Sequence, residues 1–222
     1  MSTSSASHPV ITIDGPAASG KSSIAKLVAA HLGWTYVNTG NMYRAITWAV
    51  LDANIDPSDA DQVADCGIGV TLESPIVDGA TQVHIKGRQL SSEDLNSDPV
   101  NRAVSHVARV PSVRDRLVAA QRELAHSGPL VMEGRDIGSI VFPDSPLKIY
   151  IDASEEVRAS RRQAQGHADQ VSERDRLDST RKTAPLVIPE GATVIDNSHI
   201  TLEEAVEAVL ATVRPQLAQP AE

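Results

Sequence analysis

A glycine-rich loop near the N-terminus sets the strongest limit on the architecture of this chain. Residues 10–14 (VITID) are mostly apolar and β-branched, and they predict a buried strand. Residues 15–22 (GPAASGKS) match G-x-x-x-x-G-K-[ST] at every fixed position. Apolar residues then recur at helical spacing as far as Gly33, a helix stop signal. A strand, this loop and a helix in that order are typical of a phosphate-binding site, because backbone N–H groups and the helix N-terminus converge on the anion.

Several classes of protein use such a loop, and other motifs separate them. Lys21 is expected to reach the β- and γ-phosphates of a nucleotide, and the hydroxyl of Ser22 to ligate Mg²⁺. The chain contains neither the D-x-x-G and N-K-x-D pair of GTPase switches nor the L-S-G-G-Q run of transporter ATPases. A small kinase remains, in which the loop holds ATP and a second site holds the acceptor.

Short apolar runs alternate with helical patterns along the chain, and this alternation predicts the fold class. After the first strand, further strand candidates lie at residues 34–37, 130–132, 147–151 and 193–195. Helices are expected at residues 21–32, 42–51, 98–108, 112–126, 155 onward and 201–214. Thr201 and Glu204 predict a capping box at the start of the last helix. The pattern favours an α/β fold, a P-loop kinase core with a five-stranded parallel sheet and helices on both faces.

Two further segments predict additions to this core. Residues 68–72 and 82–90 show strand-like alternation around a turn at residues 78–79, which indicates a small antiparallel insert. Residues 163–182 are highly charged and lack an apolar stripe, so we expect a mobile lid there. The alternative is a solvated helix face with ordinary ion pairs, which is the commoner case.

Length and composition fit one soluble unit. At roughly 150 residues per domain, 222 residues make one domain or one core with an inserted piece. We expect a disordered tail at residues 1–9 and a single unit at 10–222, with its core at 10–37, 127–162 and 183–214 and its acceptor domain at 38–126. The chain has one cysteine and no signal peptide, which favours the cytoplasm. No apolar run approaches the roughly 18 residues of a membrane span, so no membrane partner is expected.

The charge balance argues against nucleic acid as a partner but leaves room for phosphate. The net charge is -9, which makes the chain a poor general binder of DNA or RNA. Of the 20 basic residues 15 are Arg, whose rigid donor fork suits phosphate. GC-rich codon usage would produce the same excess, so composition alone leaves both explanations open.

Several charged side chains follow predicted strands, where an open parallel sheet forms its ligand crevice. Asp14, Thr39, Arg44 and Arg135 could therefore meet there, although they are far apart in the sequence. An acceptor that is itself a phosphate needs such cations, because charge accumulates around the transferred group. Each residue also has a simpler explanation as a surface side chain or a local ion pair.

Five segments, in this order, together resemble the bacterial cytidylate kinase family. They are residues 15–23 (GPAASGKSS), 38–44 (NTGNMYR), 105–121 (SHVARVPSVRDRLVAAQ), 133–143 (EGRDIGSIVFP) and 173–186 (ERDRLDSTRKTAPL). The similarity extends from about residue 10 to residue 212, and the last two segments are far more specific than the loop. It implies ATP-dependent phosphorylation of CMP, and of dCMP, with Mg²⁺ as cofactor and the antiparallel insert in the acceptor domain.

The resemblance also implies roles for individual residues. ATP is expected on the loop, at Gly15, Pro16, Ala17, Ala18, Ser19, Gly20, Lys21, Ser22 and Ser23. The acceptor is expected at Thr39, Tyr43, Arg44, Ser105, Arg114, Arg135, Asp136, Arg174, Asp178 and Arg181. The catalytic charges would come from Lys21, Arg135, Arg174 and Arg181. Within the acceptor set, Ser105, Arg114 and Asp136 would read the base and Asp178 would bind the sugar.

The implied base-reading residues are chemically consistent with cytosine. Asp136 and the Ser105 hydroxyl can accept from its exocyclic amine, and Arg114 can donate to N3 and O2. Uracil would place a carbonyl against Asp136, an acceptor facing an acceptor. We expect no obligatory general base, because the acceptor phosphate is already ionised; Asp136 and Asp14 are the fallback candidates.

Two rival functions stay open on the sequence. One is a kinase for UMP, AMP or a non-nucleotide acceptor, which an acceptor screen would identify. The other is a nucleotide-binding protein that keeps the fold without turnover. The seven histidines lack metal-ligand spacing, and nothing demands a dimer, so we expect a monomer with no metal beyond the Mg²⁺ of ATP.

Overall fold

The structure is a computed structural model that describes residues 8–164 and 186–217. Its main sheet has seven strands in the order β10-β9-β1-β8-β2-β5-β4. The first five are parallel and form the predicted sheet: β10 (Thr193–Asp196), β9 (Lys148–Asp152), β1 (Val10–Asp14), β8 (Leu130–Gly134) and β2 (Thr35–Asn38). Both β1 and β8 are buried along their whole length, as expected for central strands of a parallel sheet.

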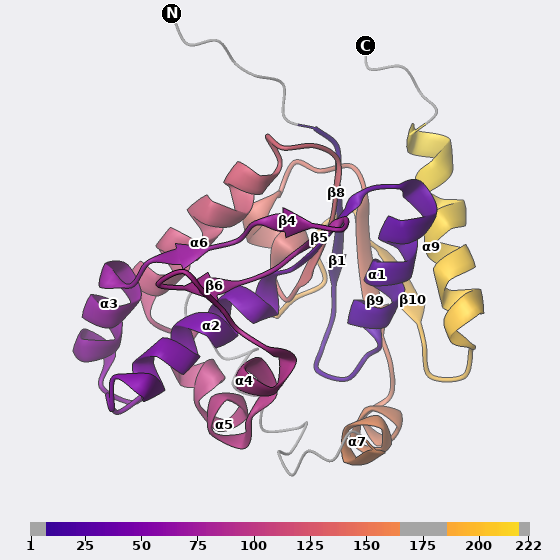
Figure 1. Cartoon of the computed structure of the whole chain (residues 1–222). Coiled ribbons are helices and arrows are strands. Elements are labelled where there is room, and N and C mark those ends of the chain that lie inside the picture. Colours follow the sequence, from indigo (N-terminus) through magenta and orange to yellow (C-terminus); the bar gives the residue numbers. More distant parts are fainter. Residues whose placement is uncertain (1–7, 165–185, 218–222) are drawn as a thin grey trace, which may run out of the picture.

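Helices cover both faces of this sheet, as the alternation predicts (Figure 1). On one face α1 (Lys21–Leu32) and α9 (Leu202–Leu217) pack together, and they share an apolar core with Ile13 and Ile149 of the strands. On the other face lie α2 (Thr39–Asp52) and α6 (Pro111–Leu124). Thr201 and Glu204 form the predicted capping box before α9, with bonds of 2.7 and 3.2 Å.

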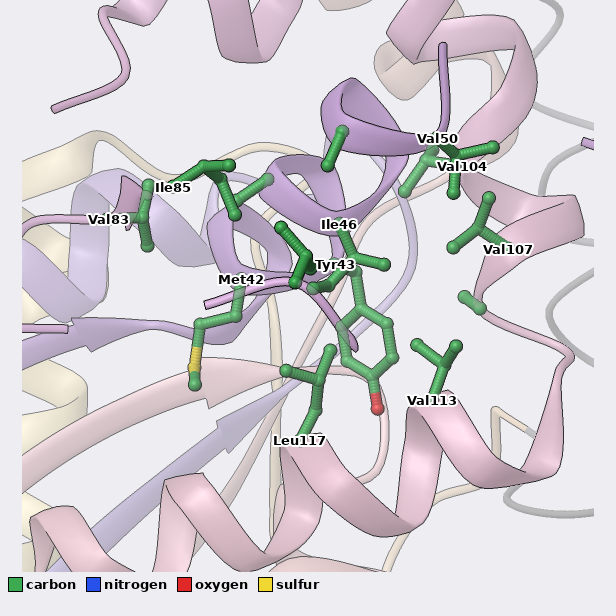
Figure 2. Packing of buried hydrophobic residues seen from close by; sticks show 14 of the residues in the cluster. Met42, Tyr43, Ile46, Val50, Val83, Ile85, Val104, Val107, Val113 and Leu117 are labelled. Atoms are coloured by element: carbon green, nitrogen blue, oxygen red, sulfur yellow. The ribbon is translucent and has the colours of Figure 1, made fainter. Parts of the chain in front are cut away.

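A second apolar core holds the predicted acceptor side together. It joins α2 and α6 to α3 (Ala60–Gly69) and α5 (Asp98–Val107). Figure 2 shows the Tyr43 ring pointing from α2 toward α6, with Val113 and Leu117 beside it. The short helix α4 (Ser92–Asn96) precedes α5, and α7 (Glu155–Ala164) follows β9. Figure 1 places α4, α5 and α7 around the carboxyl ends of the parallel strands.

The predicted antiparallel insert is present but divided between two sheets. The hairpin of β4 (Ile76–Val77) and β5 (Ala80–Thr81) turns at Asp78 and Gly79, and β5 joins the main sheet beside β2. A separate antiparallel sheet contains β3 (Leu72–Glu73), β6 (His84–Ile85) and β7 (Arg88–Gln89). The alternation of apolar residues does not predict that this hairpin extends the parallel sheet.

Two other expectations need correction, and one element is unpredicted. Residues 68 and 69 end helix α3, whereas the alternation predicts a strand there. His8 and Pro9, assigned to a disordered tail, pair with the folded chain: the His8 N–H donates to Ala125 O at 3.2 Å and Pro9 O accepts from Leu130 N–H at 3.1 Å. A π-helix, η1 (Ile137–Val141), follows β8 and is unpredicted.

Of the residues expected to form the lid, 165–182 lie outside the described ranges, and so do residues 1–7. Residues 163 and 164, assigned to the lid, form the last turn of α7. Across residues 8–164 and 186–217, no helix is both long enough and apolar enough to cross a bilayer.

Candidate active site

The glycine-rich loop connects β1 to α1 at the carboxyl end of the sheet, as predicted. Gly15 leaves no room for a side chain, because a Cβ there would collide with the carbonyl oxygen of Ile151. Gly20, the N-cap of α1, has a φ of 93° and supplies no side-chain cap to the helix. The first N–H groups of α1 therefore face the loop interior, where an anion would meet them.

Two polar side chains of the loop fit a bound phosphate. Lys21 is 5% exposed, and its Nζ donates to the carbonyl oxygen of Pro16 at 3.0 Å. The Ser19 Oγ is buried and has no hydrogen-bond partner among the described residues. Burying an unpartnered hydroxyl is unfavourable, so this donor fits a ligand oxygen in the loop.

A carboxylate at the end of β8 lies beside the loop. Glu133 is 3% exposed, and its Oε1 accepts from the Ser22 hydroxyl at 2.7 Å and from the Tyr36 hydroxyl at 3.3 Å. Burial and the neighbouring Glu133 raise the pKa of the Tyr36 phenol well above its ordinary value, so Tyr36 stays a neutral donor. A hydroxyl and a carboxylate are hard oxygen ligands, and together with phosphate oxygens they suit Mg²⁺.

Helix α7 and the end of β10 hold the loop from its other side. Arg161 donates to Ser19 O at 3.2 Å and to Asn197 O at 2.8 Å. The Asn197 Nδ2 also donates to Ser19 O, at 2.7 Å, and Arg158 donates to Ala17 O at 3.3 Å. These donors fix the backbone carbonyls of the loop and leave its N–H groups directed inward.

The acceptor side begins at α2. The buried Thr39 hydroxyl donates to Glu133 O at 2.9 Å, which ties the start of α2 to the end of β8. One turn later Arg44 donates through Nη1 to Leu95 O at 2.9 Å and to Asn101 Oδ1 at 2.8 Å. Arg135 follows β8, and its Nη1 donates to Gly134 O at 3.4 Å.

The predicted base-reading residues line the same cavity as the loop, and two of them are in contact with each other. Arg114 of α6 forms a buried ion pair with Asp136, and its Nη1 donates to Ala108 O at 3.2 Å. The guanidinium also lies over the Tyr43 ring, 5.5 Å from its centroid. Ser105 of α5 lines the same cavity. Residues from three helices and the β8–η1 junction are therefore arranged as one polar wall.

One cavity of about 940 Å³ contains both ends of this arrangement. The predicted residues that line it are Ala17, Ala18, Gly20, Lys21, Ser22, Ser23, Thr39, Tyr43, Arg44, Ser105, Arg114, Arg135 and Asp136. Gly15, Pro16 and Ser19 complete the loop beneath them. Arg174, Asp178 and Arg181 lie outside the described residues.

Thr39, Arg44 and Arg135 line one cavity as expected, but Asp14 is not among the residues that line it. Asp14 is fully buried behind the cavity and accepts the N–H groups of Ile137 and Gly138, at 2.7 Å each. Burial raises its pKa to about 7, against the lowering effect of these donors and of Lys21. It follows a strand as predicted, but its side chain turns into the β1–η1 junction. Asp14 is therefore unsuited to the fallback role of general base.

Sequence reasoning missed several cavity residues. They are Asn38, Asn41, Ser92, Asn96, Glu133, Arg161, Arg162 and Asn197. Glu133 directly follows the apolar run of β8, and Asn197 is the first residue after β10, so the strand-end rule that selected Arg135 could have found them. Arg161 and Arg162 are adjacent on a helix with no motif, and only the packing of α7 brings Arg161 to the loop and Arg162 to Asn101 at the cavity.

The fold and this cavity define a P-loop kinase core, with a nucleotide loop and an arginine-rich acceptor wall. The model of the cytidylate kinase family matches residues 11–215. A cytidylate kinase of Mycobacterium avium (strain 104) is 44% identical, over 92% of this chain and 95% of that protein. A cytidylate kinase of Caldanaerobacter subterraneus subsp. tengcongensis is 41% identical, over 92% and 94%. Among solved structures, a gluconokinase of Sinorhizobium meliloti 1021 aligns over 95% of each chain, with 19% identity and a TM-score of 0.46. The chain belongs to the cytidylate kinase family.

Proposed function

We propose that this ATP-dependent CMP kinase uses the two ends of one cavity for its two substrates, and that dCMP is also an acceptor. The observation that carries the proposal is the shared cavity, which joins the loop around Lys21 to the Arg114–Asp136 pair. A volume of about 940 Å³ lies at the upper end of the range for ligand pockets, as two nucleotides require. Placing both substrates in one cavity aligns the acceptor phosphate with the γ-phosphate of ATP.

On the donor side, the loop N–H groups, Ser19 and Lys21 bind the phosphates of ATP. Lys21 moves from the Pro16 carbonyl to the phosphate oxygens, because a charged partner binds an ammonium more strongly than a neutral carbonyl does. Ser22 and Glu133 would hold Mg²⁺, whose charge offsets that of the transferring phosphoryl group. Mg²⁺ commonly binds through one or two protein oxygens plus phosphates, so this pair is a sufficient protein contribution.

On the acceptor side, the cytosine edge meets the polar wall. Asp136 accepts from the exocyclic amine while its other contacts hold Arg114 in place to donate to N3 and O2. Ser105 adds a second acceptor for the amine. Because the Arg114–Asp136 pair exists before substrate arrives, the site is preorganised and little ordering is required on binding.

The arginines of the site would stabilise the negative charge of the phosphates. Arg44 and Arg135 line the cavity, and they would bind the acceptor phosphate. By the family resemblance, Arg174 and Arg181 add charge near the reacting phosphates and Asp178 binds the sugar. The protein then positions two anions in line, excludes water and stabilises the developing charge, and no side chain needs to remove a proton.

We further propose a cytoplasmic monomer in which residues 163–182 close over the nucleotides. The single cysteine supports a reducing compartment. Sedimentation equilibrium at assay concentration would test the oligomeric state, and a mass near twice that of one chain would contradict this proposal.

Release of ADP tests the function directly. The enzyme is incubated with ATP and Mg²⁺ and with CMP, dCMP, UMP, AMP or no acceptor. We expect rapid release with CMP and dCMP only. Turnover with UMP or AMP alone would support a kinase activity but contradict the assignment of Ser105, Arg114 and Asp136 as cytosine-reading residues. Release in none of the tubes, despite binding of ATP and CMP, would favour a protein that binds nucleotides without turnover.

A further inference from the structure

A buried asparagine of α5 lies between the acceptor and donor sides of the cavity. Asn101 is 5% exposed, and its Oδ1 accepts from Arg44 Nη1 at 2.8 Å and from Arg162 Nη2 at 3.3 Å. Arg44 belongs to α2, next to the acceptor site, whereas Arg162 belongs to α7, which also supports the ATP loop. One amide oxygen therefore holds two guanidinium groups that come from opposite sides of the cavity.

The rest of the Asn101 side chain is fixed as well. Its Nδ2 donates to Asn96 O at 2.7 Å, and Arg44 donates to the preceding carbonyl, Leu95 O, at 2.9 Å. Both carbonyls belong to the last turn of α4, where a helix leaves such groups without internal partners. Asn101 and Arg44 therefore cap α4 together. Because both ends of the amide are engaged, its oxygen has a single orientation toward the two guanidinium groups.

The neutrality of this acceptor is what suits an anion site. Arg44 and Arg162 both line the cavity. A carboxylate at position 101 would bind them more tightly through charge-assisted bonds. It would also cancel part of the charge that attracts a phosphate and would repel the phosphate itself. An amide orients the two arginines without offsetting their charge.

We propose that Asn101 is a positioning residue that holds Arg44 and Arg162 together as a paired site for the phosphate of the acceptor. The inference rests on the proposed function, which places that phosphate beside Arg44. It adds Arg162, and thereby helix α7, to the acceptor site, and it links the acceptor phosphate to the helix that grips the ATP loop.

Three variants test this role. Asn101→Asp keeps the shape, adds a charge and removes the Nδ2 donor to Asn96 O. Asn101→Leu removes the acceptor oxygen, and Arg102→Gln is a matched control on the exposed face of the same helix. Binding of CMP and of cytidine, which lacks the phosphate, is measured by calorimetry without ATP. Thermal unfolding of each variant is recorded in parallel.

For Asn101→Asp we expect the Kd of CMP to rise roughly tenfold or more while the Kd of cytidine stays within about twofold. The Tm of Asn101→Asp reports the balance between ion pairs gained with the two arginines and the bond to Asn96 O that the lost Nδ2 donor made. Asn101→Leu should also weaken CMP selectively, and Arg102→Gln should match the wild type. A merely structural role predicts equal losses for CMP and cytidine.

Two results would overturn the inference: unchanged CMP binding in Asn101→Asp, or parallel weakening of CMP and cytidine. The Asp variant keeps the test informative if the Leu variant does not fold. Wild-type turnover of CMP is measured separately. If the wild type fails to phosphorylate CMP, the proposed function fails; if it succeeds and Asn101→Asp binds CMP normally, only the role of Asn101 fails.

Discussion

At the scale of single residues, the base wall shows what sequence reasoning can and cannot supply. The resemblance selected Ser105, Arg114 and Asp136 from two separate segments, and in the structure all three line the same cavity. It did not indicate that Arg114 and Asp136 form a buried pair with each other. That pairing depends on how α6 docks against the β8–η1 junction, which is a property of packing and not of local sequence.

Replacement of Arg114 should change the preference of the enzyme for CMP over UMP. Arg114→Met removes the donor that suits cytosine, so kcat/KM for CMP should fall roughly tenfold or more relative to kcat/KM for UMP. The variant also leaves Asp136 buried without its partner, which lowers stability. The CMP-to-UMP ratio is taken within one preparation and is therefore independent of the folded fraction. An equal loss for both acceptors would show that Arg114 does not read the base; the exposed Arg109→Met is the control.

Loss of the loop lysine should affect transfer and spare the fold. Lys21→Ala removes a charge aimed at the phosphates, and we expect kcat/KM to fall about a hundredfold or more. The far-ultraviolet circular dichroism spectrum should be unchanged, because the substitution leaves the backbone of the loop and of α1 intact, and α1 contains Ala at several other positions. Lys26→Ala, on the exposed face of the same helix, serves as control. Near-normal activity of Lys21→Ala would refute the assignment of the loop.

At the scale of elements, the strands and helices of the core and the presence of an antiparallel insert were predictable, but helix α3 and the division of the insert between two sheets were not. Each core strand combines an apolar run with flanking turn residues, so its type follows from local pattern. Helix α3 was missed because its buried face is short and contains Gly67, which carries no hydrophobic signal. A glycine is needed there because α3 approaches α6 closely: a Cβ at Gly67 would lie 2.5 Å from Val113 Cγ2. Only the tertiary structure reveals this constraint.

This close approach predicts a local packing defect. Gly67→Ala should destabilise the chain by about 1–3 kcal/mol, since the extra methyl group forces α3 and α6 apart. Urea unfolding measures the change, and Val113→Ala in the same chain should recover part of it. At Gly69, a Cβ would have no neighbour within 4 Å among the described residues, so Gly69→Ala is the matched control. A stable Gly67→Ala variant would contradict the close packing.

The junction of β1 and η1 should make stability depend on pH. Burial raises the pKa of Asp14 from its ordinary value of 3.8 to about 7, so between these pH values the folded chain holds a proton that the unfolded chain lacks. The contribution of Asp14 to the free energy of unfolding is therefore greatest at low pH and declines as pH rises toward 7. Urea unfolding at several pH values should show the difference between wild type and Asp14→Asn decreasing from about pH 5 to about pH 7. A difference that grows with pH would contradict the raised pKa.

At the scale of the whole molecule, an acidic chain encloses a cationic cavity. The net charge is -9, yet Lys21, Arg44, Arg114, Arg135, Arg161 and Arg162 line the cavity against Glu133 and Asp136. The excess of arginine noted in the composition is therefore partly a property of the site. The overall charge gave no hint of this distribution, because it depends on which faces the fold turns inward.

The distribution predicts a salt effect on both substrates. Screening weakens attraction between the cavity and nucleotide phosphates, so KM for CMP and for ATP should rise severalfold from about 0.05 M to about 0.5 M KCl. Binding of uncharged cytidine should be nearly unaffected. Initial rates and calorimetry supply the two measurements. A KM that is flat across this range would indicate that the arginines are already neutralised by partners within the fold.

Glu133 contacts both halves of the cavity at once: its carboxylate accepts from Ser22 on the ATP side, and its carbonyl oxygen accepts from Thr39 on the acceptor side. Any inherited change at this position alters the carboxylate and can shift the carbonyl with it. Adaptation toward a new donor and adaptation toward a new acceptor are consequently not independent in this protein. If a substitution at Glu133 relaxes the specificity for one substrate, it also changes the structural context of the other substrate site. Every later substitution that affects the second specificity then acts in that altered context.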